Sequence, residues 1–357
     1  MKIVVDIGHP AHVHFFKNFI WEMKRRGHKI LITTKEKDVT TKLLENFGFK
    51  YVKLGSNENS LIKKIINIPI IDLKMFKVVK GFAPDIFIGL ASHRTARISK
   101  LFRKPSIIFN DTDHSLHTHL LYLPFTDLVL TPSCFRKDFG KKQFRYNGYH
   151  ELAYLHPKYF KPNSSVLDDL AINKDDKYAV IRFVAWSASH DIGQTGLSLE
   201  VKKKTVEVLL KYIKIFISSE EELPNELREY QIKIQPEKMH DALAFATLSI
   251  SEGATMTSEC AVLGTPAIYV NSLELGYCTE QEYKYGLVFG YRNSKGVLDK
   301  ALELLNTPNL KQEWQKRREK MLSEKIDVSA FMVWFIENYP ESAKITKENP
   351  EYQLNFK

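Results

Sequence analysis

Short apolar runs alternate with longer amphipathic stretches along the first half of the chain. Five of these runs have the length of buried strands and lie at residues 2–7, 28–33, 86–88, 106–109 and 127–130, and a further strand is expected to begin at residues 51–52. The stretches between them, such as 15–26 and 38–48, have the apolar spacing of helices and end at or next to a glycine. Because strands and helices alternate strictly, this half predicts a parallel, doubly wound sheet of the α/β class.

The alternation breaks between residues 147 and 176 and then resumes. This interval contains Pro157, Pro162 and an Asn-Ser-Ser run, which is typical of a crossing between domains. Further strands are predicted at residues 178–184, 213–217, 231–234, 248–250, 267–270 and 287–289. The pattern therefore predicts a second sheet after the interval.

The end of the chain is predicted to be helical. Helices are expected at residues 295–305, 310–322 and 328–339, and the polar tail after Pro340 is expected to be partly disordered. We expect a Rossmann-like domain over residues 1–150, a linker over 151–176, a second Rossmann-like domain over 177–325, and a C-terminal helix and tail over 326–357. The last segment is expected to pack back on the first domain.

Composition narrows the class of protein. The 357 residues are enough for two domains, and the net charge of +10 suits phosphorylated ligands, nucleic acid or an anionic membrane surface. The three cysteines, Cys134, Cys260 and Cys278, show no paired spacing, which favours a reducing cytoplasm. No signal peptide and no apolar run long enough to span a bilayer is recognised, so a cytoplasmic protein is expected.

Polar or ionisable residues gather where three of the predicted strands end. These residues are His9, His12 and His14, then Ser92 and His93, and finally Asp111, Asp113 and His114. If the sheet is parallel, all three strand ends lie on one rim, and titratable groups that converge on a rim are typical of an active site. Each histidine taken alone is more often structural than catalytic.

A metal site and a phosphate-binding loop of the common kinds were considered. The Asp-x-Asp pair at Asp111 and Asp113 suits a divalent cation, but the sequence has no dense cage of carboxylates and no His-Glu-x-x-His. It also has no Walker P-loop and no Gly-x-Gly-x-x-Gly. We therefore expect no metal and no cofactor.

The stretch 247–270, TLSISEGATMTSECAVLGTPAIYV, predicts a strand, a glycine turn, a helix and a second strand. Free backbone N–H groups and the positive end of the helix dipole would make the helix start near Thr255 suitable for a diphosphate. Thr255, Thr257 and Ser258 would add hydroxyl donors, and Glu259 would accept hydrogen bonds from a ribose. The alternative is an ordinary capped helix with a solvated Glu259.

The segment 61–80 is predicted to be a helix interrupted at Pro69. Its isoleucines alternate with lysines, so one interpretation is a basic amphipathic surface that rests on anionic lipid. The other interpretation, a helix pair that packs on the core and exposes its lysines, is preferred from the sequence alone. Nucleic acid is not expected as a partner, because the aromatic residues are not interleaved with lysines on a predicted sheet face.

Two motifs resemble those of a known superfamily. GHPAHVHFFKNFIWEMKRRGH near the N-terminus and SEGATMTSECAVLGTP near residue 260 resemble segments of the GT-B nucleotide-sugar enzymes. The chain looks closest to uncharacterised archaeal and bacterial proteins related to UDP-GlcNAc 2-epimerases and to the lipid II-forming GlcNAc transferase. The resemblance implies the GT-B fold, in which two Rossmann-like domains face each other across a cleft.

The resemblance also implies site residues. Gly253, Ala254, Thr255, Met256, Thr257 and Ser258 would form the diphosphate site, Glu259 would bind the ribose, and Met239 and His240 would lie near the base. His12, Asp113 and His190 would lie near the reacting sugar. The glycine-rich loop of the transferases is replaced here by AWSASHDIG, and the Asp-Ser-Gly-Gly of the epimerases by Ser-Glu-Gly-Ala, so the specific chemistry is less constrained than the nucleotide site.

These observations lead to a functional expectation. The chain is expected to be a glycosyltransferase that uses a UDP-sugar and a sugar or lipid-linked acceptor in surface polysaccharide or glycolipid synthesis, with His12 or Asp113 as the base. A UDP-GlcNAc 2-epimerase, epimerising or hydrolysing, and a non-catalytic nucleotide-sugar binding protein remain as alternatives. Peripheral contact with the inner face of the membrane is part of the expectation, and the oligomeric state is left open.

Overall fold

The chain forms two compact units. The structure, a computed structural model, describes residues 1–36, 38–56, 61–185 and 197–357. Unit 1 contains residues 1–154 and 326–357, and unit 2 contains residues 155–325. The C-terminal segment therefore belongs to the same unit as the N-terminus. The segment expected to be a linker is divided between the units and contains two short helices, α6 (Leu152–Leu155) and α7 (Val166–Asp169).

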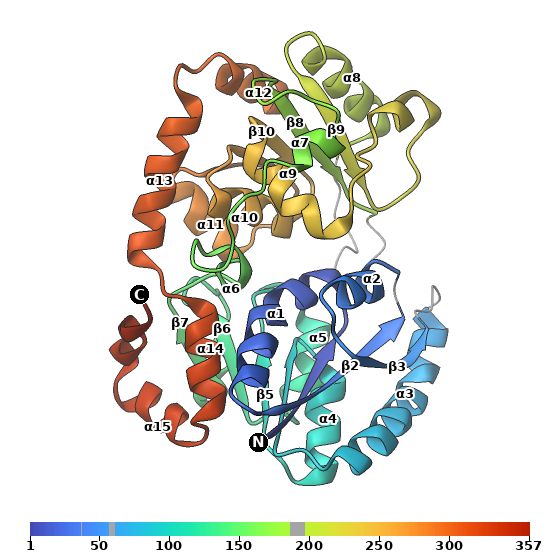
Figure 1. The fold of residues 1–357 in the computed structure, drawn as a ribbon, viewed down its shortest axis with the longest axis vertical. Helices are drawn as coiled ribbons and strands as arrows, with labels where there is room; N and C mark the ends of the chain where they lie inside the picture. Colours follow the sequence, from blue (N-terminus) through green and yellow to red (C-terminus); the bar gives the residue numbers. More distant parts are fainter. Residues whose placement is uncertain (37, 57–60, 186–196) are drawn as a thin grey trace. The chain divides into compact units, whose positions relative to one another are not determined.

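Unit 1 is built on a parallel sheet. Within the described residues its seven strands lie in the order β3-β2-β1-β4-β5-β6-β7 (Figure 1). They are β1 (Lys2–Ile7), β2 (Lys29–Glu36), β3 (Tyr51–Ser56), β4 (Ile86–Leu90), β5 (Ser106–Phe109), β6 (Leu128–Pro132) and β7 (Gln143–Tyr146). This order reverses direction between β1 and β4, which is the switch point where doubly wound sheets bind ligands.

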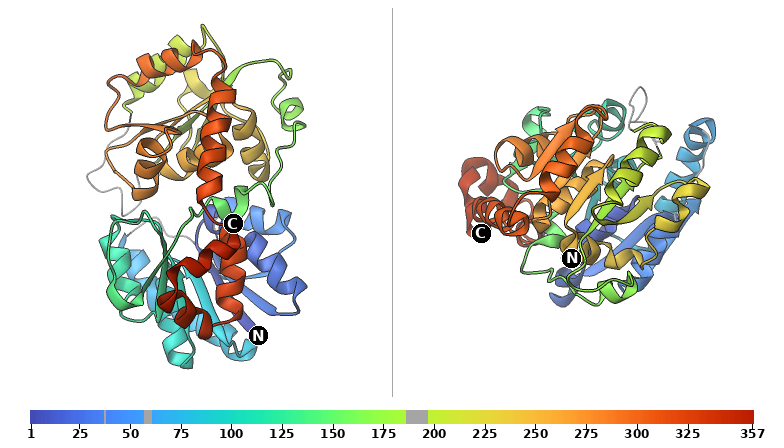
Figure 2. Two further views of the ribbon diagram at one scale, coloured as in Figure 1. Left: turned by 90° about the vertical axis from the view of Figure 1, so that its left-hand side faces the viewer. Right: turned by 90° about the horizontal axis from the view of Figure 1, so that it is seen from above.

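Helices of unit 1 cover this sheet. They are α1 (Pro10–Arg25), α2 (Asp38–Asn46), α3 (Leu61–Phe82), α4 (His93–Phe102), α5 (Leu116–Tyr122), α14 (Val328–Glu337) and α15 (Glu341–Glu348), with 3₁₀ turns η1 (Gly140–Lys142) and η4 (Pro350–Phe356). Helix α14 packs against α1, and α3, α4 and α5 are successive neighbours (Figures 1 and 2). Because right-handed crossovers on opposite sides of the switch point place helices on opposite faces, α1 and α4 cover different faces of the sheet.

The tail after Pro340 is ordered, so the prediction of a partly disordered tail was wrong. Helix α15 and the turn η4 follow it, and the ring of Tyr352 stacks on that of Trp334 with centroids 4.8 Å apart. Phe356 also contacts the Trp334 ring. Ring contacts of these half-buried aromatic side chains therefore hold the tail on α14.

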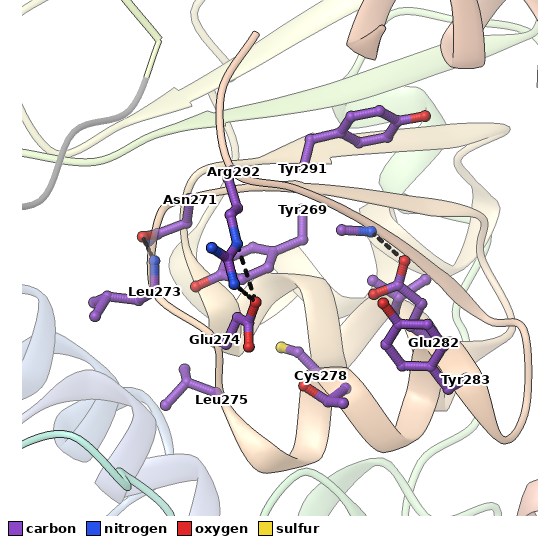
Figure 3. Close-up of a pocket in the computed structure, with 13 residues that line it drawn as sticks. Tyr269, Asn271, Leu273, Glu274, Leu275, Cys278, Glu282, Tyr283, Tyr291 and Arg292 are labelled. Atoms are coloured by element: carbon purple, nitrogen blue, oxygen red, sulfur yellow. Dashed lines mark hydrogen bonds and ion pairs between the residues drawn. The ribbon is translucent and has the colours of Figure 1, made fainter. Parts of the chain in front are cut away.

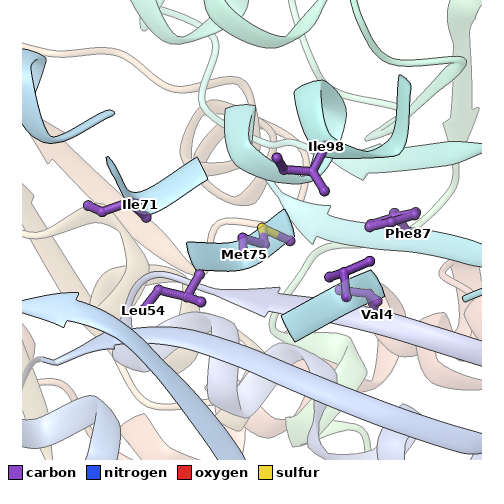
Figure 4. Packing of buried hydrophobic residues seen from close by; sticks show 7 residues of the cluster. Val4, Leu54, Ile71, Met75, Phe87 and Ile98 are labelled. Carbon is purple, nitrogen blue, oxygen red and sulfur yellow. The ribbon is translucent and has the colours of Figure 1, made fainter. Parts of the chain in front are cut away.

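Helix α3 is continuous, although the sequence predicted an interruption at Pro69. One face of the helix places Ile71, Met75 and Val79 in a buried cluster with Val4 of β1 and Phe87 of β4 (Figure 4). Burying this face stabilises the helix enough to compensate for the hydrogen bond that is lost at Pro69.

Unit 2 is built on a smaller parallel sheet. Within the described residues its five strands lie in the order β12-β11-β10-β8-β9. They are β8 (Tyr178–Phe183), β9 (Lys214–Ser219), β10 (Leu248–Ser251), β11 (Ala267–Val270) and β12 (Val288–Tyr291). The predicted strand at 231–234 was wrong: the segment makes one isolated bridge, Ile217 to Gln231, and its side chains stay at least partly exposed.

Helices flank the strands of unit 2. They are α8 (Leu199–Leu209), α9 (Met239–Phe245), α10 (Ala254–Leu263), α11 (Gly276–Tyr283), α12 (Val297–Leu305) and α13 (Leu310–Glu324), with 3₁₀ turns η2 (Asn225–Tyr230) and η3 (Pro236–Lys238). The switch point of this sheet lies between β8 and β10, where Arg182 is paired with Ser251. Two doubly wound parallel sheets confirm the predicted fold class.

Candidate functional site

The start of helix α10 presents backbone donors at the switch point of unit 2. Its N-cap residue, Gly253, makes no side-chain cap and has an extended conformation, with φ −97° and ψ 126°. The first turn carries no acidic residue, and Ala254, Thr255 and Met256 are exposed or half-buried. The positive end of this helix therefore has neither a side-chain cap nor an acidic first-turn residue that would compete with an anion.

Two of the predicted hydroxyl donors face the interior instead. Thr257 and Ser258 are fully buried. The Thr257 hydroxyl donates to the carbonyl of Gly253 at 3.0 Å, and the Ser258 hydroxyl accepts from the Gln281 amide at 2.7 Å. The accessible part of the predicted diphosphate site is thus the backbone of residues 253–256 together with the Thr255 side chain.

Glu252 precedes this helix start and is a buried carboxylate that the sequence analysis did not single out. One of its oxygens accepts from the backbone N–H of Leu197 at 2.7 Å, and the other accepts from the N–H of Val184 and the Lys202 ammonium, both at 3.0 Å. Lys202 in turn lies 4.6 Å from the centroid of the Phe183 ring. The Glu252 charge is therefore compensated internally and does not oppose an anion at α10.

Glu259 and His240 form a second buried pair behind the helix start. Their Oε1 and Nε2 atoms are 2.9 Å apart, and both side chains are almost fully buried. The ring of Phe160 approaches that of His240 edge to face, with centroids 6.2 Å apart. The structure brings together two residues that the resemblance had assigned to the ribose and the base. Met239, the other residue assigned to the base, begins α9 and is half-buried.

A pocket of about 160 Å³ adjoins the α10 start at the carboxyl ends of β11 and β12 (Figure 3). Asn271, in its wall, donates to the carbonyl of Glu252 at 2.9 Å, and the Cys278 thiol lies 3.9 Å from the carbonyl of Ala254. An ion pair joins Arg292 to Glu274 in the same wall. The pocket thus combines aromatic faces with carboxylate, amide and guanidinium groups next to the helix start.

In unit 1 a buried carboxylate organises the switch point between β1 and β4. Asp6 accepts from the Thr33 hydroxyl at 2.9 Å, the Ser92 hydroxyl at 2.5 Å and the Arg94 guanidinium at 2.8 Å. Burial raises the pKa of Asp6, but Arg94 and the hydroxyl donors outweigh it and hold that pKa below its usual range. A methyl group on Gly89 would lie 2.7 Å from Ser92 Cβ, so glycine is needed where β4 passes this cluster.

His12 lies in the first turns of α1 rather than in the predicted loop. Helix α1 begins at Pro10, the preferred position for proline, and the His9 side chain caps it by accepting from the Ala11 N–H at 3.2 Å. His12 Nδ1 accepts from the Gly8 N–H at 3.2 Å. Burial, followed by the neighbouring His9, lowers the pKa of His12 to about 3, although Asp6 and Asp111 act in the opposite direction. His12 is therefore neutral near pH 7.

Asp111 is, with Asp6, a carboxylate close to His12, whereas the predicted Asp113 contacts another part of unit 1. Asp113 is buried and accepts from the backbone N–H of Arg136 at 2.7 Å. Asp111 lies 2.9 Å from His150, between Oδ2 and Nδ1. Burial raises the pKa of Asp111, but His150 and the Thr112 hydroxyl lower it further, so Asp111 is an anion near neutral pH. His190, the third predicted catalytic residue, lies outside the described residues.

Comparison with known proteins places the chain in a family. The profile of the family described as "Protein of unknown function (DUF354)" matches residues 1–335. The chain belongs to this family. "Uncharacterized protein MJ0665" of Methanocaldococcus jannaschii is 25% identical over 288 residues, which cover 77% of this chain and 83% of that protein.

A second relative is a transferase. The UDP-N-acetylglucosamine--N-acetylmuramyl-(pentapeptide) pyrophosphoryl-undecaprenol N-acetylglucosamine transferase of Desulfotalea psychrophila is 28% identical over 91 residues. These residues cover 23% of the DUF354 chain and 25% of the transferase. This similarity is therefore local.

Solved structures share the fold over nearly the whole DUF354 chain. A Staphylococcus aureus MnaA–UDP structure has a TM-score of 0.69 at 12% identity and covers 96% of this chain and 97% of its own. UDP-GlcNAc 2-epimerase of Neisseria meningitidis, bound to UDP-GlcNAc, has a TM-score of 0.67 at 13% identity and covers 94% of this chain and 99% of its own. The Streptomyces sp. SF2575 glycosyltransferase SsfS6 has a TM-score of 0.60 at 11% identity and covers 95% of this chain and 100% of its own. These similarities confirm the predicted resemblance and the GT-B fold.

Proposed function

We propose that this DUF354 protein is a GT-B-type glycosyltransferase that takes its sugar from a nucleoside diphosphate sugar, a UDP-sugar. In this proposal unit 2 binds the donor, and the histidine and carboxylate cluster of unit 1 acts on a sugar or lipid-linked acceptor. The product belongs to surface polysaccharide or glycolipid synthesis. The UDP and UDP-GlcNAc named for two structures of the same fold support a donor of this class.

One observation carries the proposal: α10 begins without a side-chain cap, next to the buried pair of Glu259 and His240. The uncapped N–H groups of residues 254–256 suit the diphosphate, and Glu259 suits the ribose hydroxyls. Glu252, which would otherwise repel an anion here, is neutralised by Lys202. The local field at the helix start is therefore favourable for negative charge.

This arrangement also suits the chemistry of transfer. When the anomeric carbon bonds to the acceptor oxygen, the bond to the diphosphate breaks and negative charge develops on the leaving group. Helix N–H groups that already point at this position stabilise the charge without reorganisation. The proposed mechanism accordingly requires no metal ion.

Calorimetric titration of UDP with two variants of one residue tests the proposal. Ala254→Pro removes one N–H from the helix start, yet proline fits the first helical position and the extended Gly253 before it. Ala254→Gly keeps the N–H and serves as the matched control. We expect the proline variant to bind UDP at least about tenfold more weakly than the glycine variant, since a hydrogen bond to a charged group contributes about 1.5–3 kcal/mol. Equal affinities would reject the site.

A UDP-GlcNAc 2-epimerase is the second candidate, favoured by the higher TM-scores of the MnaA and epimerase structures. Incubation with UDP-GlcNAc in the absence of acceptor separates the two. Formation of UDP-ManNAc, or of UDP with free ManNAc, would support the epimerase. Turnover only after an acceptor is added would support the transferase.

We further propose that unit 1 rests on an anionic membrane from the cytoplasmic side. None of the described helices has the length and apolarity to cross a bilayer. The neighbouring helices α3, α4 and α5 nevertheless expose large apolar side chains, among them Leu73, Leu101, Leu116 and Leu120. Lysines 74, 77 and 80 are exposed on α3. Apolar residues beside basic ones suit the interface of a bilayer that contains acidic lipids.

A further inference from the structure

The two imidazoles near Asp111 must carry their protons on different nitrogens. A backbone N–H can only donate, so His12 Nδ1, 3.2 Å from the Gly8 nitrogen, must accept. Because burial keeps His12 neutral, its single ring proton lies on Nε2. His12 therefore offers a donor to a ligand and has no free nitrogen with which to take up a proton.

His150 has the opposite arrangement. Its Nδ1 lies 2.9 Å from a carboxylate oxygen of Asp111. The ionised carboxylate can only accept, so Nδ1 must carry a proton, and the lone pair of a neutral His150 lies on Nε2. A carboxylate that holds Nδ1–H and leaves Nε2 as acceptor is the arrangement of a histidine base.

Burial makes this arrangement unusual. The His150 side chain is 5% exposed, and its Nε2 is buried with no hydrogen-bond partner among the described residues. Its ring contacts that of Phe15, with centroids 4.4 Å apart, and that of Tyr146, with centroids 6.4 Å apart and near-parallel planes. The Tyr146 hydroxyl is also buried without a partner among these residues. Polar atoms left in this state typically mark a functional site or a bound molecule.

Asp111 contacts the His150 ring directly, and His12 lies close enough to interact electrostatically with both Asp111 and His150. Tyr146 remains protonated, because burial and then the charges of Asp111, Cys134 and Glu151 raise its pKa far above the usual value. Asp111 is thus positioned to stabilise an imidazolium that forms on His150.

We infer that His150 is the general base of the proposed transfer, that Asp111 is its positioning residue, and that His12 is a hydrogen-bond donor rather than the base. The inference rests on the proposed function and changes the roles of residues within it. His12 and Asp113, which the sequence suggested as bases, are replaced in that role by a residue from the end of the predicted first domain.

The proton and electron balance follows from this assignment. The acceptor O–H bond breaks, and its proton moves to His150 Nε2. The electron pair that remains on oxygen forms the new bond to the anomeric carbon, and the pair of the broken sugar–phosphate bond leaves with the diphosphate. Since Nε2 is buried, the acceptor must displace the groups that cover this nitrogen before the proton can move.

Histidine-selective ¹⁵N labelling tests the proton positions without reference to activity. Long-range ¹H–¹⁵N spectra at pH 8 distinguish protonated from unprotonated ring nitrogens, and the variants His12→Gln and His150→Gln assign two of the twelve histidines. We expect a proton on Nε2 of His12 and on Nδ1 of His150. A proton on Nε2 of neutral His150 would overturn the inference.

Kinetics then test the role in catalysis. UDP release from UDP-GlcNAc with an octyl glycoside of GlcNAc as acceptor is measured between pH 5 and 9. His150→Gln should lower kcat by about 100-fold or more with KM within about threefold, and should remove the acidic limb of the pH profile. Asp111→Asn should also lower kcat and shift that limb, whereas His117→Gln, a change at an exposed residue of α5, should change neither.

The two arms separate failure of the inference from failure of the proposed function. If the wild-type protein releases no UDP, this donor and acceptor are rejected. The ¹⁵N spectra then still test the inference, because they show whether Nε2 of His150 is unprotonated. If the wild-type protein turns over and His150→Gln retains its kcat and pH profile, the inference is rejected and the proposed function stands.

Discussion

Removal of the Glu252 carboxylate should destabilise unit 2 more than most single substitutions. The side chain is 1% exposed and accepts from two backbone N–H groups and from Lys202, whose own side chain is 16% exposed. In Glu252→Ala the ammonium loses its buried partner and both N–H groups lose their acceptor. Breaking a buried ion pair in this way costs about 3–5 kcal/mol.

The expected shift in melting temperature follows from the size of the unit. Unit 2 spans residues 155–325. For domains of such length each kcal/mol lowers Tm by about 2–4 °C, so Glu252→Ala should lower the transition of unit 2 by about 6–20 °C. Differential scanning calorimetry measures this shift, and hydrogen exchange at Val184 and Leu197 shows whether the two amides have lost protection.

A neighbouring ion pair provides the matched control. Lys203, the residue after Lys202, pairs with Glu226 at 2.6 Å, but the Glu226 side chain is 63% exposed. Glu226→Ala removes the carboxylate partner of the adjacent lysine on the same helix, α8, and should leave the transition unchanged, because exposed ion pairs contribute little. In this account Glu252 holds the chain segment before α8 against the start of α10. Equal melting temperatures for Glu252→Ala and Glu226→Ala would refute this assignment.

Three further predictions concern titration, ribose recognition and lipid. The pKa of His12 is about 3 in the folded chain and 6.5 in the unfolded chain, so below pH 6.5 the unfolded state binds a proton that the folded state does not, and stability falls. Between pH 7 and pH 5 the free energy of unfolding, measured with urea, should therefore fall by up to about 2 kcal/mol more in the wild type than in His12→Gln. We expect the wild type to bind UDP roughly tenfold more tightly than 2′-deoxy-UDP, as measured by calorimetry, and His240→Ala to reduce this preference to within about threefold, because Glu259 loses the partner that orients it. An unchanged preference would show that the pair of Glu259 and His240 does not recognise the ribose. Replacement of both Leu116 and Leu120 by serine should abolish flotation with phosphatidylglycerol vesicles while leaving UDP affinity unchanged. The proposed membrane face would be contradicted if the double variant still floated, or if the wild type floated equally well with phosphatidylcholine vesicles.

Strands in the interior of the sheets were predictable because their side chains are buried on both faces. β5 (Ser106–Phe109) and β11 (Ala267–Val270) match the predicted ranges, since each is an uninterrupted apolar run that follows a proline. β7 was missed because it lies at the sheet edge, where Gln143 and Arg145 remain partly or fully exposed and break the apolar run. The early start of α1 had a readable signal, namely Pro10 behind a capping residue.

The candidate nucleotide site was more accessible to sequence reasoning than the cluster of unit 1. The α10 start is a local feature, formed by one strand, one turn and one helix that are consecutive in the chain. The partners of Glu252 lie 55 and 68 residues away, and Asp111 and Arg94 also lie far in the sequence from their partners His150 and Asp6, so no spacing rule connects them. Asp113 was preferred to Asp111 because the resemblance pointed to it, and the sequence alone could not show that Asp111 is the carboxylate that contacts His150.

The central claim is that the start of α10 holds a diphosphate while Glu259 holds the ribose. A crystal structure of the protein grown with UDP tests it most directly. The account predicts phosphate oxygens within hydrogen-bonding distance, about 3 Å, of the N–H groups of residues 254–256, and a ribose hydroxyl at a similar distance from the Glu259 carboxylate. UDP bound elsewhere, or a helix start that stays empty at a saturating concentration, would contradict it.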